Sequence, residues 1–110
     1  MEHPSTLTSM GNLASTYREQ GRLKEAEELE VQVMETKKRV LGLEHPSTLT
    51  SMSNLAYILR GQGCEGRAIS LMKECVQLRE KVLGPQHHYT RSALQALSEW
   101  QLESVHIGGQ

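Results

Sequence analysis

The chain has 110 residues, a formal net charge of -1 and 23% charged residues, so no strong electrostatic field favours binding to nucleic acid or an acidic membrane. It contains no Phe, one Trp and three Tyr, and an aliphatic core of this kind favours packed helices over a sheet. No segment approaches the 18 apolar residues of a membrane span, and the amino terminus lacks a secretion signal. We therefore expect one soluble, cytoplasmic domain that binds neither nucleic acid nor membrane.

Only two cysteines, Cys64 and Cys75, occur in the chain. On one helix they would stand about 16 Å apart along the axis, which is too far for a disulfide bond. Their spacing is also unlike the ligand pattern of a zinc site. We predict reduced thiols, as is usual in the cytoplasm.

The chain repeats itself with a period of 42 residues. Residues 2–10 recur letter for letter as residues 44–52, and residues 12–14 and 40–42 return as 54–56 and 82–84, which gives 20 identities over 42 positions. We predict repeat units at residues 2–43 and 44–85, a half unit at 86–105 and a tail at 106–110. A repeat array usually acts through an extended surface and seldom through one catalytic pocket.

Each unit divides at a glycine into two amphipathic helical stretches. The first unit predicts helices over residues 5–20 and 23–41, ended by Gly21 and Gly42. The proline and hydroxyl residues at 4–6 are start signals, because a hydroxyl can accept an unpaired backbone N–H. The predicted core positions are Leu7, Met10, Leu13, Ala14, Tyr17, Leu23, Ala26, Leu29, Val33 and Val40.

The second unit repeats this plan, and the half unit supplies one more helix over about residues 89–103, followed by a frayed tail from residue 107. Gly66 should weaken the start of the fourth helix, because glycine in a helix costs up to about 1 kcal/mol relative to alanine. The predicted core positions of these helices are Leu49, Met52, Leu55, Ala56, Leu59, Ala68, Leu71, Met72, Cys75, Val76, Leu78, Val82, Ala93, Leu94, Leu97 and Trp100. The sequence therefore predicts an all-α fold of five helices.

The segment from Asn12 to Leu29 reads Asn-Leu-Ala-x-x-Tyr-x-x-x-Gly-x-x-x-Glu-Ala-Glu-x-Leu and resembles the tetratricopeptide repeat. The Lys-Val-Leu-Gly at 81–84 and the Glu-His-Pro at 44–46 are similar to the 42-residue version in kinesin light chains and in the repeat tails of fungal NLR-type proteins. Glu30 stands where that family usually has an aromatic residue. The resemblance implies a right-handed superhelix of helix hairpins whose first helices line a concave groove for peptide segments of partner proteins.

Residues of the first helices outside the apolar stripe remain available to such a groove. These candidate peptide-binding residues are Thr8, Asn12, Ser15, Arg18, Thr50, Ser53, Asn54, Tyr57, Arg60 and Gln95, with Gly11, Ser92 and Glu99 beside them. Asn12 and Asn54 are the best supported, because a side-chain amide pairs with a peptide backbone of any sequence. The alternative is that each amide ties its own helix to a neighbouring helix.

The charge of the partner stays open. A clamp for a terminal carboxylate is disfavoured, because the positions that would supply its cations hold Thr8, Ser92 and Ala96. Arg18 and Arg60 would still attract an acidic peptide, unless each only caps its helix end.

No arrangement of residues predicts catalysis. The resemblance implies that His3 and His45, which are one repeat apart, belong to the turn between units. His87 and His88 have no spaced Cys or carboxylate partner, so we expect no metal. No serine elbow, glycine-rich phosphate loop or paired-histidine helix is present. We predict that the chain is not an enzyme and needs no cofactor.

Two functions of different classes remain. In the first, the chain is a protein-interaction module that binds a partner peptide. In the second, it is a structural segment of a larger NLR-like scaffold, and homo-oligomers form through an exposed stripe at Leu7 and Met10. Either way, we expect a piece of a longer array, because fewer than three complete repeats are marginally stable alone.

Overall fold

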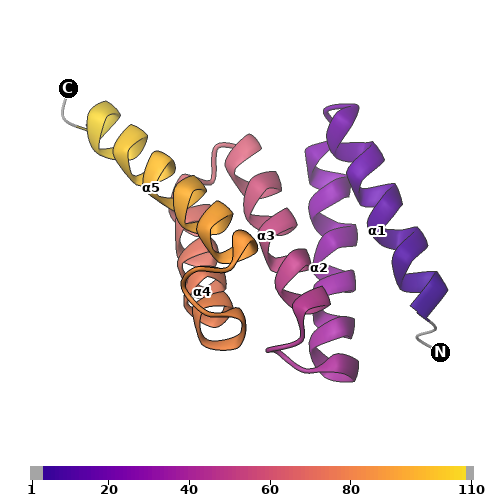
Figure 1. Cartoon of the computed structure of the whole chain (residues 1–110). Helices are drawn as coiled ribbons and strands as arrows, with labels where there is room; N and C mark the ends of the chain where they lie inside the picture. The colour runs from indigo at the N-terminus through magenta and orange to yellow at the C-terminus, as the bar shows by residue number, and fades with distance from the viewer. Residues whose placement is uncertain (1–3, 109–110) are drawn as a thin grey trace.

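The computed structural model describes the backbone of residues 4–108 and the side chains of residues 6–104. Five helices follow one another: α1 (Pro4–Glu19), α2 (Leu23–Leu41), α3 (Pro46–Gly61), α4 (Glu65–Leu83) and α5 (His88–Gly108). They stand side by side in chain order, each antiparallel to the next, in a slab of 49 × 34 × 19 Å (Figure 1). The predicted all-α fold of five helices is confirmed, and α2 matches its predicted bounds to the residue.

Histidines start the inner helices of the second and third units. The Nδ1 atom of His45 accepts the backbone N–H of Ser47 at 3.0 Å, and His87 accepts that of Tyr89 at 3.1 Å. We expected a hydroxyl in this role. The hydroxyl of Thr48 instead donates to the carbonyl of Gly42 at 2.8 Å, so it ties α3 to the end of α2. This His–Pro–Ser–Thr segment therefore joins repeat units.

Four glycines in two repeat-equivalent pairs end the helices as predicted. Gly21 and Gly63, at the turn inside each hairpin, have φ of +79° and +84°. Gly42 and Gly84, at the turn between hairpins, have φ of +97° and +91°. Side chains disfavour these conformations, which explains why glycine occupies both positions in both units.

The central helix α3 is buried on two sides. One stripe faces α2 and the other faces α4, whereas α1 and α5 each have a neighbour on one side only (Figure 1). Toward α2, the Thr48 hydroxyl reaches the carbonyl of Gly42. Toward α4, a shared core cluster holds Leu49, Met52, Leu55, Ala56 and Leu59 together with Ala68, Met72, Cys75 and Val76. The core therefore runs through the middle of the slab and thins toward its two ends.

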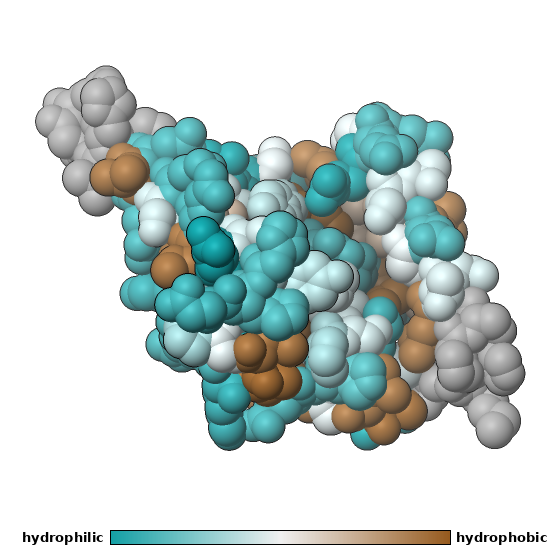
Figure 2. Space-filling model, viewed as in Figure 1, coloured by the Kyte–Doolittle hydropathy of each residue, from teal (hydrophilic) through white to brown (hydrophobic). Residues whose placement is uncertain are grey.

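Four predicted core residues are exposed. Leu13 and Leu94 are both 44% exposed, because they lie on the sides of α1 and α5 that no other described helix covers. Val40 and Val82 are 51% and 37% exposed, since the last turn of each second helix directs this side chain away from both neighbours. Figure 2 shows apolar side chains on the viewed face as small separate patches among hydrophilic ones.

The prediction of an exposed stripe for self-association at Leu7 and Met10 is also wrong. Leu7 is buried and Met10 is half-buried, because both belong to the side of α1 that packs on α2. Their equivalents Leu49 and Met52 are buried against α4 in the same way.

The last helix is longer than predicted and is held to α3 by an aromatic cluster. It continues to Gly108, through part of the predicted tail, of which residues 109–110 lie outside the described range. Trp100 is buried and meets the edge of Tyr57, with ring centroids 5.0 Å apart. The guanidinium of Arg60 lies 5.3 Å from the Trp100 ring and forms an ion pair with Glu103. These contacts hold the second half of α5 against α3.

Both cysteines are free thiols, as predicted. Cys75 is fully buried in α4, and its Sγ lies 3.5 Å from the carbonyl oxygen of Leu49. Burial raises the pKa of the Cys75 thiol, although the nearby Arg79 acts in the opposite direction. Cys75 is therefore a core residue that joins α4 to α3, and its neutral thiol is a poor nucleophile.

Two glycines that differ in backbone conformation, but not in available space, allow a matched stability test. A Cβ at Gly66 or at Gly84 would meet no atom within 4 Å. Because Gly66 is helical, Gly66→Ala should raise the free energy of unfolding by about 0.5–1 kcal/mol. Gly84 has φ +91° and ψ +156°, so Gly84→Ala should lower it by about 1–3 kcal/mol. Urea unfolding followed by circular dichroism measures both, and effects of the same sign would contradict this account of the helix ends.

Candidate functional site

A hollow of about 200 Å³ lies between α1, α2 and α3. Four of the predicted peptide-binding residues line it together: Thr8, Asn12 and Ser15 from α1, and Asn54 from α3. The other lining residues are Leu7, Gly11, Glu30, Val33, Lys37 and Ser51. We call this the first hollow. It brings the two repeat-equivalent asparagines from successive inner helices into one surface.

Glu30, which sequence reasoning did not select, lies at the floor of the first hollow. Its residue is only 1% exposed, and its carboxylate accepts a hydrogen bond from Ser51. Burial raises the pKa of this carboxyl, while the Ser51 hydrogen bond and the charges of Lys37 and Arg18 act in the opposite direction. The signal in the sequence was a charged residue at a position where the family has an apolar ring.

A second hollow of about 150 Å³ lies one repeat further on, between α3, α4 and α5. Of the predicted residues, Ser53 and Tyr57 line it, with Ser92 beside them. The remaining lining residues are Arg79, Tyr89 and Ala93. We call the two hollows, with the α3 surface between them, the groove.

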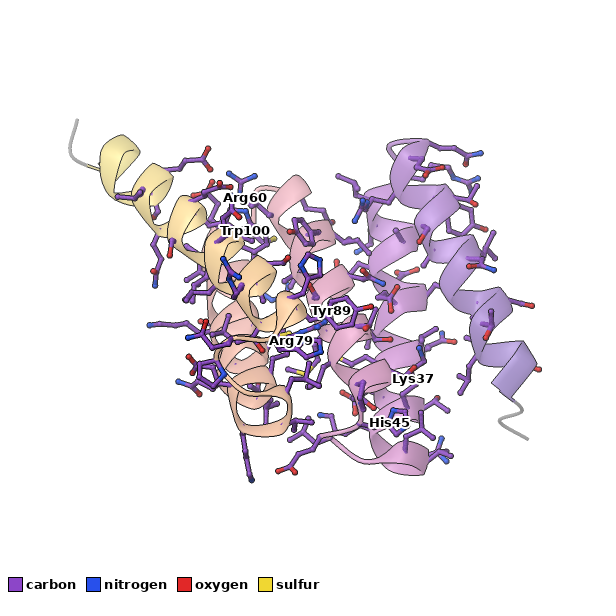
Figure 3. All side chains as sticks on the ribbon, in the orientation of Figure 1. Lys37, His45, Arg60, Arg79, Tyr89 and Trp100 are labelled. Carbon is purple, nitrogen blue, oxygen red and sulfur yellow. The ribbon has the colours of Figure 1, made fainter. Side chains whose placement is uncertain are left out.

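Arg79 rises into the second hollow from the outer helix α4. It is 6% exposed, its Nε donates to Cys75 Sγ at 3.3 Å, and its guanidinium carbon lies 5.4 Å from the centre of the Tyr89 ring. Figure 3 shows the Arg79 and Tyr89 side chains next to one another between α5 and α3. Sequence reasoning missed both residues because Arg79 comes from an outer helix, and Tyr89 lies in the first turn of α5, where no groove position was predicted.

The two hollows are repeat equivalents with different charge. Lys37 and Arg79 occupy the same position in successive units, and so do Glu30 and Met72. Lys37 in the first hollow therefore has a buried carboxylate nearby. In the second hollow that carboxylate is replaced by Met72, and among the described residues no ion pair involves Arg79.

The other predicted residues lie outside the two hollows. Arg18 reaches toward the space between them, with its guanidinium carbon 5.8 Å from the Tyr57 ring centre. Arg60 is engaged with Trp100 and Glu103, and the Thr50 hydroxyl donates to its own helix at the Pro46 carbonyl, 3.1 Å away. Gln95 donates to Glu99 at 3.2 Å and lines a separate open hollow on α5.

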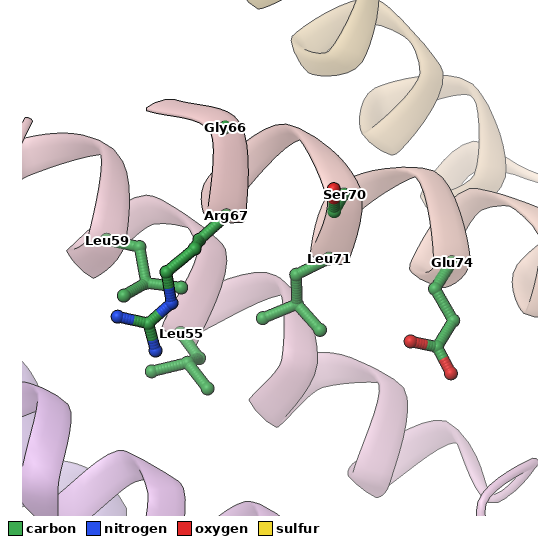
Figure 4. Close-up of a pocket in the computed structure, with 7 residues that line it drawn as sticks. All are labelled: Leu55, Leu59, Gly66, Arg67, Ser70, Leu71 and Glu74. Atoms are coloured by element: carbon green, nitrogen blue, oxygen red, sulfur yellow. The ribbon is translucent and has the colours of Figure 1, made fainter. Parts of the chain in front are cut away.

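The opposite side of the slab has its own hollow, of about 430 Å³. Leu55, Leu59 and Leu71 form its apolar floor, and Arg67 and Glu74 lie at its rim (Figure 4). At this rim Arg67 forms an ion pair with Glu27 of α2 at 3.5 Å, and Gln62 donates to the same carboxylate at 2.7 Å. This hollow is therefore part of the joint between the two hairpins and is separate from the groove.

Other classes of site find no support within the described part of the chain. Among residues 4–108, no three His, Cys, Asp or Glu side chains gather as metal ligands would. The described helices include none with both the length and the hydropathy that crossing a membrane requires.

The comparisons with known proteins agree with this architecture. The sequence profile of the tetratricopeptide repeat family matches residues 6–47 and 48–89, which confirms the 42-residue period in a frame four residues later than ours. Solved structures of nearly identical TPR-like repeats from Podosopora anserina, ascribed to a kinesin light chain, superpose with a TM-score of 0.84 at 31% identity. A variant of the same repeats gives the same values.

These matches cover 98% of this chain and 51% of the solved chains, so this chain spans about half their length. No curated protein matches the chain. These matches show the family and the fold of the chain. They identify no ligand, so an argument about the ligand has to start from the residues that line the groove.

The buried Glu30 predicts a dependence of stability on pH. Because its pKa is raised in the folded state, the native protein binds this proton more tightly than the unfolded chain. Its contribution to stability is therefore largest below the ordinary glutamate pKa of 4.5 and falls as the pH rises through the raised value. Glu30→Gln should remove this fall and should be more stable than wild type at pH 7.

Urea midpoints of wild type and Glu30→Gln between pH 4 and pH 8 measure the effect. Glu28→Gln, at an exposed position of the same helix, is the matched control and should follow wild type at every pH. A constant difference between wild type and Glu30→Gln across this range would contradict the burial argument.

Proposed function

Because the chain belongs to the tetratricopeptide repeat family, whose repeats are generally protein–protein interaction modules, we propose that its groove binds an extended peptide segment of a partner protein. The observation that carries the proposal is the shared lining of the first hollow by Asn12 and Asn54. Each amide offers a donor and an acceptor at equivalent points of successive repeats. A peptide lying across the inner helices would meet both amides with its backbone.

The second hollow supports an acidic side chain in that peptide. Arg79 is nearly buried, and the carboxylate that accompanies Lys37 in the first unit is absent here, since Met72 replaces Glu30. A guanidinium with little access to water and no ion-pair partner among the described residues favours an incoming carboxylate. Tyr57 and Tyr89 add flat surfaces beside it for the neighbouring peptide side chain.

The asparagine pair gives the first test. A phage-displayed random peptide library is selected on the intact chain, and the best peptide is synthesised with a fluorophore for anisotropy titration. Asn12→Ala combined with Asn54→Ala should weaken its binding about 5–30-fold, because each lost hydrogen bond is worth about 1 kcal/mol. Both positions are at least partly accessible, so the thermal midpoint should change little.

Thr50→Ala combined with Gln95→Ala is the matched control, since these inner-helix residues line neither hollow, and it should change the affinity by less than about twofold. Equal losses in the two double variants would argue against the groove. Selected peptides that bind both variants as wild type would favour the alternative, a structural array whose groove carries no ligand.

The charge of Arg79 gives the second test. The selected peptides should be enriched in Asp and Glu, and binding of the synthesised peptide should weaken as salt rises. Arg79→Gln should reduce the affinity about 10–100-fold, because hydrogen bonds to charged groups are worth about 1.5–3 kcal/mol. Arg79→Lys, which retains the positive charge, should lose less. Enrichment in Lys and Arg, or binding that ignores salt, would contradict an acidic ligand.

A further inference from the structure

The second repeat unit has small side chains at two positions where the first unit has large ones. Leu59 stands in place of Tyr17, and Gly66 stands in place of Lys24. Both Leu59 and Gly66 line the hollow of about 430 Å³ on the side of the slab opposite the groove, which we call the outer hollow. A Cβ at Gly66 would meet no atom within 4 Å. The outer hollow therefore lies where unit one carries larger side chains.

Tyr17 shows which group occupies this place in unit one. Its ring is half-buried near the start of α2, and the guanidinium carbon of Arg22 lies 4.4 Å from the ring centre. This distance is that of a cation–π contact. In unit two the equivalent pair is Leu59 and Cys64, which cannot form such a contact. Unit one therefore has a ring under a cation where unit two has neither.

The lining of the outer hollow offers a ring similar surroundings. Leu55, Leu59 and Leu71 form an apolar floor, and Figure 4 shows the Arg67 guanidinium close to Leu59 and Leu55. The Arg67 side chain is 65% exposed, so a ligand can reach it. A ring inserted here would bury apolar surface against the leucines and would lie next to a guanidinium, as the ring of Tyr17 does.

Opposite charges lie at the two ends of the outer hollow (Figure 4). Arg67 forms an ion pair with Glu27 at 3.5 Å, whereas no ion pair among the described residues involves Glu74. Residues 67 and 74 are two helical turns apart in α4, which is about 10 Å along the helix axis. An extended peptide covers that distance in about three residues. Glu74 is therefore placed to attract a basic residue that follows or precedes the ring.

From these observations we propose that the outer hollow binds an aromatic side chain of a partner protein, on an extended segment with a lysine or arginine about three residues from the ring. The ring packs on the leucine floor beside the Arg67 guanidinium, and the basic residue pairs with Glu74. The outer hollow shares no lining residue with the two hollows of the groove. It is a second interaction surface that does not depend on peptide binding in the groove.

The aromatic side chains of the chain itself are already engaged, which is why the proposed ring comes from another protein. The arginines at 18, 22, 60 and 79 lie 4.4–5.8 Å from the ring centres of Tyr57, Tyr17, Trp100 and Tyr89 in turn. The chain contains no other Tyr or Trp and no Phe. A second copy would have to give up one of these contacts to fill the outer hollow.

A titration with short synthetic peptides tests the proposal. The probes are acetyl-Phe-Ala-Ala-Lys-amide and its reversed sequence, followed by the backbone amide signals of the ¹⁵N-labelled chain up to about 10 mM peptide. The signals of Gly66, Arg67, Ser70 and Leu71 should shift, because these residues line the outer hollow. At least one of the two peptides should bind at least about tenfold more tightly than its counterpart with Ala in place of Phe.

Variants that restore the side chains of unit one locate the ring. Leu59→Tyr combined with Gly66→Lys should weaken binding at least about tenfold, since the chain then fills its own hollow. Because Leu59 is buried, Gly66→Lys alone, at an exposed position, is the second variant and should also weaken binding. Circular dichroism checks that both variants keep their helix content.

The charge at the other end is tested separately. Glu74→Gln should weaken binding of the lysine peptide about two- to fivefold and should abolish its advantage over a peptide with Ala in place of Lys. Glu80→Gln, at an exposed position of the same helix, is the matched control and should leave the affinity unchanged. Asn12→Ala combined with Asn54→Ala should also leave it unchanged, which separates this surface from the groove.

Equal affinities of the Phe and Ala peptides, or shifts confined to residues of the groove, would overturn the proposal. Full affinity in a folded Gly66→Lys variant would show that the ring does not enter the outer hollow. If the same four amide signals shift with the concentration of the chain alone, the occupant is a second copy and the assignment to a partner protein is wrong.

Discussion

The fold depends on the packing of each inner helix on the outer helices beside it. Among the described helices, α3 packs on both sides, against α2 and against α4, and is the most buried inner helix. The hydroxyls of Thr48 and Thr90 set how each inner helix meets the end of the preceding outer helix. The two threonines are repeat equivalents, but Thr48 bonds the carbonyl of Gly42 and Thr90 bonds that of Arg79, so the same hydroxyl joins the two helices through a different carbonyl in each unit.

Repetition of the backbone does not make the two hollows chemically alike. The change from Glu30 to Met72 removes a buried carboxylate from one hollow, and the change from Lys37 to Arg79 replaces an ammonium with a guanidinium. A guanidinium can bind a carboxylate through two parallel hydrogen bonds and can stack on a ring such as Tyr89, whereas an ammonium acts as a point charge. Two equivalent positions thus supply a polar hollow and a cationic, aromatic one.

Periodicity predicted the helices well because glycine spacing and the apolar stripe are local properties. It predicted both ends of α2 correctly. It also selected Asn12 and Asn54, which line the same hollow in the structure. It failed at Leu13 and Leu94, since a stripe reports which side of a helix is apolar and not whether a neighbouring helix covers it. It missed Glu30, Arg79 and Tyr89, because whether an outer helix or the first turn of α5 lines a hollow depends on the angle between helices, which sequence spacing does not encode.

The stacking of repeats and the charge of the groove are not independent properties of this chain. Glu30 contributes to both, since it bonds Ser51 in the joint between α2 and α3 and also lies beside Lys37 at the floor of the first hollow. Replacing that glutamate by methionine, as unit two does, removes the need for a hydroxyl on the next inner helix and leaves the neighbouring cation without its carboxylate. A single difference between the two units therefore changes both the contact in the joint between helices and the charge of the hollow beside it.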